Sequence, residues 1–489
     1  MIHLLRFNFA FINVNKMEKI NQQYIGGAWT PSTGTEWIKM VNPATSEVFG
    51  EALMGTECDV IAAIGAAKNA FAAFSGTSVA ERKRYLQNLH DALIERIEEL
   101  KAATIEEYGA TTTRAEWSNR YAADIFLQFK RLVDHFQFER EIGKSKLVMT
   151  PIGVNAIMTS WNSNAGSICV KLAASIAAGC TVVIKPSEWS CLQTRILTEA
   201  FDKAGLPPGV INVINGRGEM MGEILSTHPD IATLSFTGST AVGKIIARNA
   251  VETMKRMTLE LSGKSPHIIL DDADLDKATT LAINACFMNS GQACIAGSRL
   301  LVPARLMTKV ASMLKDKVSA LQVGLPTHPG TFIGPMASQK QYDRIQQYIR
   351  TGIQQGATLL VGGEGKPDGL EAGFFVKPTV FIHATPEMVI VKEEIFGPVL
   401  TVLSYETQQE AIALANDTDY GLQAYVSASD TLRAEKVARQ INAGRVSINT
   451  LWHDAEAPFG GFKQSGVGRE GGVFGLEALL EPKVILKEG

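Results

Sequence analysis

Between residues 151 and 251, short apolar runs alternate with helical patterns, and this alternation constrains the fold more than any other feature. The runs typical of buried strands are Val154–Met158, Thr181–Ile184, Val210–Ile214 and Ile231–Phe236. The helical patterns between and after them cover 167–178, 192–204 and 244–250. Strands separated by helices predict a parallel, doubly wound α/β sheet, and such a sheet binds ligands beyond the carboxyl ends of its strands.

Size and charge narrow the class further. The chain has 489 residues, too many for one hydrophobic core, so we expect two or more domains. Hydrophobic residues at 46%, charged residues at 20% and a formal net charge of -3 are typical of a globular enzyme without a basic surface for nucleic acid. No uncharged window reaches the length of a membrane span, and the short apolar stretch Met1–Lys16 lacks a cleavage site. Because Met17 opens a polar stretch, Met17 is a candidate start.

The cysteines indicate a reducing compartment and suggest a reactive thiol. They form no CxxC pair and no spacing typical of a metal site, so we expect the cytoplasm and no metal. One thiol, Cys294, lies in the glycine-containing segment Asn289–Cys294, and Glu260 precedes it in Leu259–Lys264. A potential nucleophile and a potential base in such segments predict covalent thiol chemistry followed by activation of water.

A glycine-containing turn follows the last strand of the alternating region. Thr237–Gly243 leads from this strand into a helix, where glycine and unpaired N–H groups can hold a phosphate. An ordinary strand-to-helix turn with Ser239 as the N-cap explains the same residues. Gly216, Gly218 and Gly222 form a second corner, which could equally be a plain loop.

Seven segments in order carry a specific resemblance. They are Ser160–Asn162, Lys185–Glu188, Phe236–Thr240, Leu259–Lys264, Gly291–Cys294, Glu393–Pro398 and Pro458–Gly466. In these segments the chain resembles the aldehyde dehydrogenase superfamily, over nearly its whole length from Met17.

The resemblance implies an α/β fold in three parts. It places a Rossmann-type NAD(P)-binding domain at 17–129 and 151–260, and an α/β catalytic domain at 261–460. A small β oligomerisation element at 130–150 and 475–489 would contain Lys144–Met149 and Val484–Leu486. A homodimer or homotetramer is expected.

The resemblance also assigns catalytic roles. Cys294 matches the nucleophile, which needs a lowered pKa or a nearby base to form thiolate. Asn162, with the N–H of Cys294, matches the oxyanion hole, and Glu260 matches the base that activates water. Lys171 matches a lysine of the same catalytic region. The remaining cysteines are interpreted as buried structural residues: Cys58, Cys169, Cys180, Cys191 and Cys286.

The implied cofactor is NAD, with NADP possible. Lys185 and Glu188 match the contacts to the adenosine ribose, and a Glu at 188 would repel a 2′-phosphate. The further implied contacts are Ser160, Trp161, Ser187, Gly218, Gly222, Phe236, Gly238, Ser239, Leu261, Glu394 and Phe396. Of these, Gly238 and Ser239 match the pyrophosphate turn, and Glu394 and Phe396 match the nicotinamide side.

Three departures from the family pattern concern the aldehyde tunnel and the base. Ser160 replaces a proline, Ser163–Asn164 replaces an aromatic–proline pair, and Ser262 replaces a glycine that gives the base mobility. None of the three removes a catalytic group.

The aldehyde itself is predicted from charge. Acidic semialdehyde specialists carry an arginine at the position of Val170, and Ser163, Ser167 and Ile168 bring no cation either. An uncharged aliphatic or aromatic aldehyde is therefore expected, beside Trp161, Trp452 and Phe459, because a carboxylate would enter uncompensated. In the alternative, Arg114 or Arg120 supplies the charge.

Other reactions stay open. A CoA-acylating or semialdehyde dehydrogenase is the main alternative, and Glu260 favours hydrolysis over transfer to CoA. A cofactor-independent thiol esterase would leave Lys185, Gly238 and Glu394 without a role. A non-catalytic homologue would be expected to have lost Cys294 or Glu260.

Overall fold

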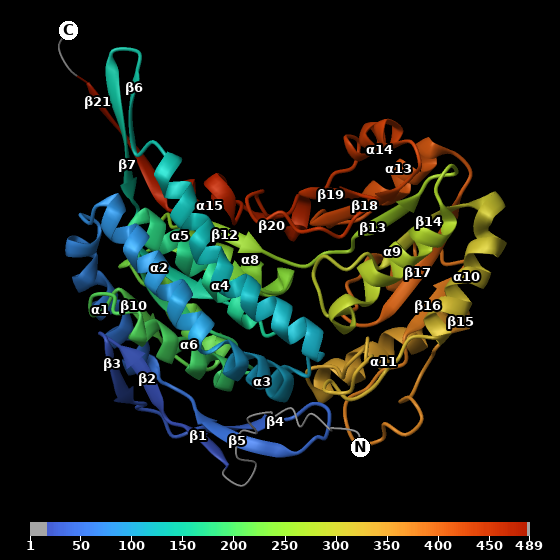
Figure 1. Cartoon of the computed structure of the whole chain (residues 1–489), viewed down its shortest axis with the longest axis horizontal. Helices are drawn as coiled ribbons and strands as arrows, with labels where there is room; N and C mark the ends of the chain where they lie inside the picture. Colours follow the sequence, from blue (N-terminus) through green and yellow to red (C-terminus); the bar gives the residue numbers. More distant parts are fainter. Residues whose placement is uncertain (1–16, 487–489) are drawn as a thin grey trace, which may run out of the picture.

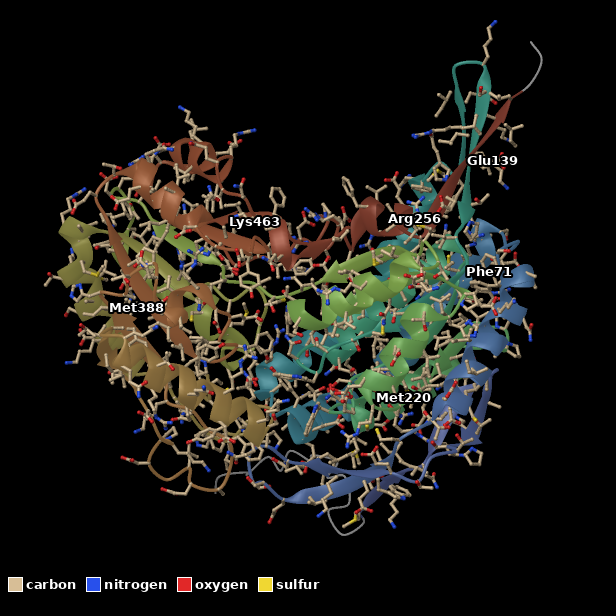
Figure 2. The ribbon with its side chains drawn as sticks, turned by 180° about the vertical axis from the view of Figure 1, so that it is seen from behind. Phe71, Glu139, Met220, Arg256, Met388 and Lys463 are labelled. Carbon is tan, nitrogen blue, oxygen red and sulfur yellow. The ribbon has the colours of Figure 1, made fainter. Side chains whose placement is uncertain are left out.

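The computed structural model describes residues 17–486. Two α/β units lie side by side, and a small third sheet projects from the first of them (Figure 1). Figure 2 shows the same arrangement from behind, with Met220 in the first unit and Met388 in the second. The stretch Met1–Lys16 lies outside the described residues. Met17, the candidate start, is the first residue that the structure describes.

The first unit is built on a mixed sheet. Its strands are β2 Gln22–Ile25, β3 Ala28–Pro31, β8 Val154–Met158, β9 Thr181–Lys185, β10 Ile211–Val213, β11 Ile231–Thr237, β12 Arg256–Glu260 and β20 Gly466–Val467. Their order is β20-β12-β11-β8-β9-β10-β2-β3, and the five strands from β12 to β10 are parallel. The alternation of strands and helices in the sequence is therefore confirmed, with antiparallel strands added at both edges.

Helices cover both faces of this sheet. They are α1 Glu57–Phe74, α2 Val79–Glu95, α3 Ile97–Tyr108, α4 Thr112–His135, α5 Asn164–Ala178, α6 Cys191–Lys203, α7 Gly218–Thr227 and α8 Thr240–Val251. Alternate side chains of β8 point to opposite faces, Ile157 to the core under α2–α6 and Ala156 to the core under α1, α7 and α8. The helix expected over 244–250 begins earlier, because Ser239 caps its first turn.

Two smaller elements complete this side. A three-stranded sheet contains β1 Glu18–Ile20, β5 Val48–Leu53 and β4 Trp37–Val41. The short helix α15 Gly472–Glu477 returns from the far end of the chain, and its Leu476 joins the core beneath α4 and α5. The C-terminal segment thus packs on the first unit.

The second unit has its own sheet. The strands are β13 Pro266–Ile269, β14 Arg299–Pro303, β15 Thr358–Val361, β16 Thr379–Ile382, β17 Val399–Tyr405, β18 Gln423–Ser427 and β19 Arg445–Ile448, in the order β15-β16-β17-β14-β13-β18-β19. All neighbours are parallel except β15 and β16. The helices are α9 Leu275–Phe287, α10 Met307–Ser319, α11 Gln339–Gln354, α12 Val389–Lys392, α13 Gln408–Asn416 and α14 Thr431–Ala438.

The projecting sheet joins distant parts of the chain. It consists of β6 Glu139–Ile142, β7 Ser145–Pro151 and β21 Leu480–Leu486, and β21 pairs antiparallel with β7 over its whole length. Figures 1 and 2 show it projecting from the body, with Glu139 on the hairpin. The expected boundary at residue 130 falls inside α4, which continues to His135 because its last turns are packed in the core.

One sequence expectation about the cysteines is wrong. Cys58 is exposed, because it lies in the first turn of α1 on the side that faces solvent. Cys169, Cys180, Cys191 and Cys286 are buried, as expected. Within residues 17–486, no helix combines the length and the apolar composition needed to cross a membrane.

Candidate active site

The loop that carries Cys294 is tightly wound. Asn289, Ser290 and Gly291 all have left-handed backbone, with φ of 57°, 56° and 72°. A Cβ on Gly291 would overlap the carbonyl of Gly397, and a Cβ on Gly263 would overlap the carbonyl oxygen of Cys294. Glycine is therefore required on both sides of this loop, because no other residue lets the backbones approach so closely.

Asn162 lies beside the Cys294 loop. Its Nδ2 donates to the carbonyl oxygen of Gln292 at 3.0 Å, and Ser160 Oγ donates to its Oδ1 at 2.7 Å. Ser160, which replaces the proline of the family pattern, thus orients the amide. Gln292 in turn holds the loop from behind, because its Oε1 accepts from the N–H of Ala337 at 2.9 Å. The sequence assigned no role to Gln292, and its place in the motif was the available signal.

Glu260 ends β12 in a buried position. Its side chain is close to the backbone of Gly460, and in residues 17–486 neither carboxylate oxygen has a hydrogen-bond partner. Burial raises the pKa of Glu260 well above its usual range, the nearby Glu470 raises it further, and Lys171 lowers it in part. In this arrangement the surroundings of Glu260 favour the protonated carboxyl over the carboxylate.

Lys171 connects to an acidic residue that the sequence analysis missed. Its Nζ lies 2.6 Å from Glu470 Oε1 and donates to Thr237 Oγ1 at 2.6 Å. Lys171 is 3% exposed and Glu470 is 9% exposed, so the pair is shielded from solvent. A carboxylate so soon after the last motif was the signal in the sequence, because a buried lysine needs a counter-charge.

The pKa of the Cys294 thiol is raised, not lowered. Burial, Glu394 and Glu260 raise the pKa of Cys294 to about 12, and the N–H groups of Cys294 and Ile295 oppose this only in part. Of the two routes to thiolate that the sequence analysis named, a lowered pKa or a nearby base, the first is therefore not found in the protein without ligands. The physical reason is that two acidic groups, and no cation of comparable effect, act on the thiol.

A second group of predicted residues gathers at the carboxyl end of β9. Lys185 Nζ lies 3.0 Å from Glu188 Oε2, and the buried Ser187 lies between them in sequence. Burial raises the pKa of Glu188, but Lys185 and Arg217 outweigh it and hold the pKa below its usual range. Gly218 faces this pair, with space for a Cβ 3.7 Å from Lys185 Nζ. A carboxylate that stays ionised beside open backbone fits a ribose hydroxyl.

The turn after β11 confirms the N-cap interpretation of Ser239, and the phosphate interpretation stays a prediction. Ser239 Oγ accepts from the N–H of Val242 at 3.3 Å, which makes Ser239 the N-cap of α8. Gly238 donates its N–H to the carbonyl of Glu260 at 3.0 Å and packs against the ring of Phe236. Leu261 lies beneath α8 against Gly243. The first N–H groups of α8 remain available to an anion.

Glu394, Phe396 and Trp161 border the Cys294 loop. The N–H of Gly263 donates to Glu394 Oε1 at 3.0 Å, and Phe396 has a left-handed φ of 63°. The rings of Trp161 and Phe396 meet edge to face at 5.5 Å. Gly222, by contrast, lies on α7 near Met158 Sδ, so it contributes to packing between helix and strand.

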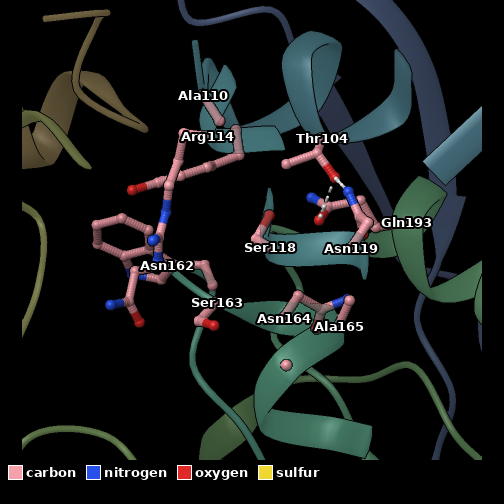
Figure 3. Close-up of a pocket in the computed structure, with 13 residues that line it drawn as sticks. Thr104, Ala110, Arg114, Ser118, Asn119, Asn162, Ser163, Asn164, Ala165 and Gln193 are labelled. Carbon is pink, nitrogen blue, oxygen red and sulfur yellow. Dashed lines mark hydrogen bonds between the residues drawn. The ribbon is translucent and has the colours of Figure 1, made fainter. Parts of the chain in front are cut away.

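Beyond Asn162 lies a hollow, drawn in Figure 3. Its lining residues are Thr104, Tyr108, Ala110, Arg114, Ser118, Asn119, Trp161, Asn162, Ser163, Asn164, Ala165, Gly166 and Gln193. Arg114 is the only charged residue among those described that line it. Arg120 is instead exposed and ion-paired with Glu116 at 3.5 Å.

The other residues expected near the tunnel differ in how deeply they are buried. Val170 is half-buried and packs against the core of the first unit. Trp452 is 74% exposed and lies on the surface. Phe459 is half-buried, with its ring centroid 6.5 Å from that of His453. The guanidinium of Arg445 lies 5.0 Å from the centre of the Phe459 ring.

Comparisons with known proteins agree with this geometry. The model of the aldehyde dehydrogenase family matches residues 29–485. A Staphylococcus saprophyticus protein provisionally named an aldehyde dehydrogenase is 45% identical over 96% of this chain and 99% of its own. Aldehyde dehydrogenase C of Pseudomonas syringae, solved as a cysteine-to-alanine mutant with NAD+ and octanal, is 42% identical over 95% of this chain and 96% of its own, with a TM-score of 0.94. Betaine aldehyde dehydrogenase of Staphylococcus aureus, solved with NAD+, is 37% identical over 95% and 94%, with a TM-score of 0.92.

Proposed function

The chain belongs to the aldehyde dehydrogenase family, and from this premise we propose that it oxidises an aldehyde to the carboxylic acid with NAD. One observation carries the proposal. The loop of Cys294 meets the amide of Asn162 and lies next to Glu260, at the carboxyl end of a doubly wound sheet. Such an end is where an α/β sheet binds its ligands.

The residues divide the reaction between them. Attack of Cys294 Sγ on the carbonyl carbon puts negative charge on the oxygen, which Asn162 Nδ2 and the N–H of Cys294 stabilise. NAD, when bound, supplies the acceptor for the hydride that leaves the substrate carbon. The acyl group then remains on Cys294 as a thioester. Glu260, once deprotonated, takes a proton from the water that releases the acid, and Lys171 with Glu470 provides a charged pair close to that carboxylate.

In this proposal the first unit, residues 17–129 and 151–260, binds NAD. Residues 261–460 form the catalytic domain. Both solved structures described above contain NAD+. Glu188, with its lowered pKa, is suited to a ribose hydroxyl and opposes a 2′-phosphate. Lys185 and Ser187 keep NADP as the second candidate, because both can bond a phosphate.

For the substrate we propose an uncharged aliphatic or aromatic aldehyde. Ser163 brings no charge to the hollow, and the similar Pseudomonas syringae enzyme was solved with octanal. Arg114 is the residue that would favour an acidic semialdehyde instead, because it lines the hollow beside Asn162. Side-by-side kcat/KM values for pentanal and succinic semialdehyde distinguish the two, and preference for the acid would refute the uncharged class.

Association and compartment complete the proposal. The exposed Val484 and Ile485 on β21, at the edge of the projecting sheet, support a homodimer or homotetramer formed through this element. The six cysteines, none of them in a disulfide, support a reducing compartment such as the cytoplasm.

One experiment tests the reaction. Absorbance at 340 nm is followed with a panel of aldehydes, with NAD or NADP, and with or without CoA. We expect NADH formation that needs no CoA. A rate that depends on CoA would establish the acylating alternative, and ester cleavage without cofactor would favour the thiol esterase.

A further inference from the structure

Beside the hollow, three polar side chains form a hydrogen-bonded series that the reaction above does not use. Arg445 Nη1 lies 2.8 Å from His453 Nδ1, and His453 Nε2 lies 3.0 Å from Tyr121 Oη. Arg445 also donates to the carbonyls of Asp454, Ala457 and Pro458. Arg445 therefore holds the loop of His453 in place from one side.

The direction of these hydrogen bonds follows from the donors. Arginine only donates, so His453 Nδ1 must accept and carries no proton. Burial, followed by Arg445 and Arg114, lowers the pKa of His453 to about 4, which leaves the ring neutral at pH 7. A neutral ring with a bare Nδ1 carries its proton on Nε2 and donates it to Tyr121 Oη. The hydroxyl proton of Tyr121 is then free to donate elsewhere.

That proton has no acceptor within residues 17–486. The only hydrogen bond of Tyr121 Oη in this part of the chain is the one to His453. The phenol is half-buried, and burial raises its pKa to about 12, so it stays protonated. A shielded donor without an acceptor is unfavourable, and a ligand oxygen that accepts from it removes that cost.

The ring of Tyr121 lies next to the hollow. Its ring is 3.8 Å from the Cβ position of Gly166, a residue of the first turn of α5 that lines the hollow with Asn162 (Figure 3). On its other sides the ring stacks on Trp117 at 5.4 Å and meets the edge of His453 at 5.2 Å. The aromatic contacts fix the ring, so the hydroxyl has a defined position.

We propose that Tyr121, oriented by Arg445 through His453, selects uncharged aldehydes that carry an acceptor oxygen in the tail, such as an ether or a hydroxyl. This inference rests on the proposed function and names the substrate class of the same site. Tyr121 contributes the donor, and His453 and Arg445 are positioning residues. A site that bonds a substrate oxygen discriminates against the analogue that lacks it.

The test uses matched pairs of aldehydes in which an ether oxygen replaces a methylene. The pairs are methoxyacetaldehyde with butanal, 3-methoxypropanal with pentanal, and 3-ethoxypropanal with hexanal. An ether oxygen accepts but never donates, so it reports only on the hydroxyl proton of Tyr121. The measured quantity is the ratio of kcat/KM for the ether to kcat/KM for the alkanal, with succinic semialdehyde as the charged comparison.

We expect Tyr121→Phe to lower this ratio by about tenfold in at least one pair, because the ring is kept and only the donor is lost. Tyr85→Phe is the matched control, since it removes a phenol hydroxyl from α2, in the core beside Phe74 and outside the hollow. His453→Gln should retain most of the ratio, because an amide both accepts from Arg445 and donates to Tyr121, whereas His453→Leu should lose it.

Two outcomes overturn the inference while leaving the proposed function intact. In one, Tyr121→Phe oxidises alkanals but leaves the ratio unchanged in every pair. In the other, the loss is confined to succinic semialdehyde, which would assign the subsite to carboxylates. Failure of the wild-type protein to oxidise any aldehyde of the panel would instead refute the proposed function.

Discussion

In the protein without ligands, the surroundings of Cys294 favour the protonated thiol over the thiolate. Burial and two carboxyl groups raise the pKa of its thiol to about 12, so very little thiolate exists at neutral pH without ligands. Reactivity must therefore depend on a change around the thiol when cofactor and substrate bind.

The first prediction concerns this thiol. Cys294→Ala should lower kcat by more than about a hundredfold, because no other group replaces the covalent step. NAD binding, measured by calorimetry, should persist. Cys58→Ala is the control, since Cys58 is exposed on α1 and should keep full activity. Activity of Cys294→Ala near the wild-type level would exclude Cys294 as the nucleophile.

The second prediction separates acylation from deacylation. Glu260→Gln should give a rapid burst of NADH followed by a slow steady rate, because the thioester forms but water is not activated. Stopped-flow absorbance at 340 nm measures both phases. Mass spectrometry should find the acyl group on the protein after the burst. A steady wild-type rate without a burst would show that another group is the base.

The third prediction is a pH dependence. The pKa of Glu260 is raised, so its proton is held at low pH and is lost only as the pH rises through that raised value. If deacylation limits turnover, kcat should increase with pH along a limb that lies above the ordinary range of a carboxyl group. Glu260→Gln should abolish this limb. A kcat independent of pH in the wild type would contradict the assignment.

At the scale of elements, the ends of β9, β11 and β12 bring the predicted groups together. Parallel strands place their carboxyl ends at one edge, so Lys185, Thr237 and Glu260 lie at the same side of the sheet although they are distant in sequence. The pairing of Thr237 with Glu260 across β11 and β12 sets their register.

The fourth prediction belongs to the loop after β9. Glu188→Ser should raise the ratio of kcat/KM for NADP to that for NAD by about tenfold, because a fixed negative charge beside the 2′ position is removed. Steady-state kinetics with both cofactors measure the ratio. Glu36→Ser is a useful control, because Glu36 is exposed and pairs with the neighbouring Arg217. An unchanged ratio would place the 2′ position elsewhere.

Several element boundaries could be predicted from the sequence, and others could not. β8 has the predicted bounds, because its apolar run is continuous and buried. The start of α5 at Asn164 was missed, because Ser163–Asn164 reads locally as a polar turn while its burial against α4 stabilises the helix. The antiparallel edge strand β20 was missed because it comes from the distant C-terminal segment.

At the scale of the whole molecule, the projecting sheet is the clearest surface for self-association. The fifth prediction is that Ile485→Asp on β21 will shift the protein to a smaller species, because a charge at an apolar edge opposes its burial. Analytical ultracentrifugation measures the species. Leu432→Asp, on the exposed face of α14, is the control. If the mass of the Ile485→Asp species equals that of the wild type, the protein does not associate through this edge of β21.

The sequence by itself determined the class of fold, and it proposed the main catalytic residues. Periodicity and turn residues are local properties, so they predicted the parallel sheet, and contiguous motifs marked Cys294, Glu260 and Asn162 as the candidate catalytic groups. Only the tertiary structure decided how these groups are charged and what surrounds them. Burial and distant neighbours set the raised pKa of Cys294, the pair of Lys171 with Glu470, and the series from Arg445 to Tyr121. Such effects depend on distances between residues far apart in the chain, and no local pattern encodes those distances.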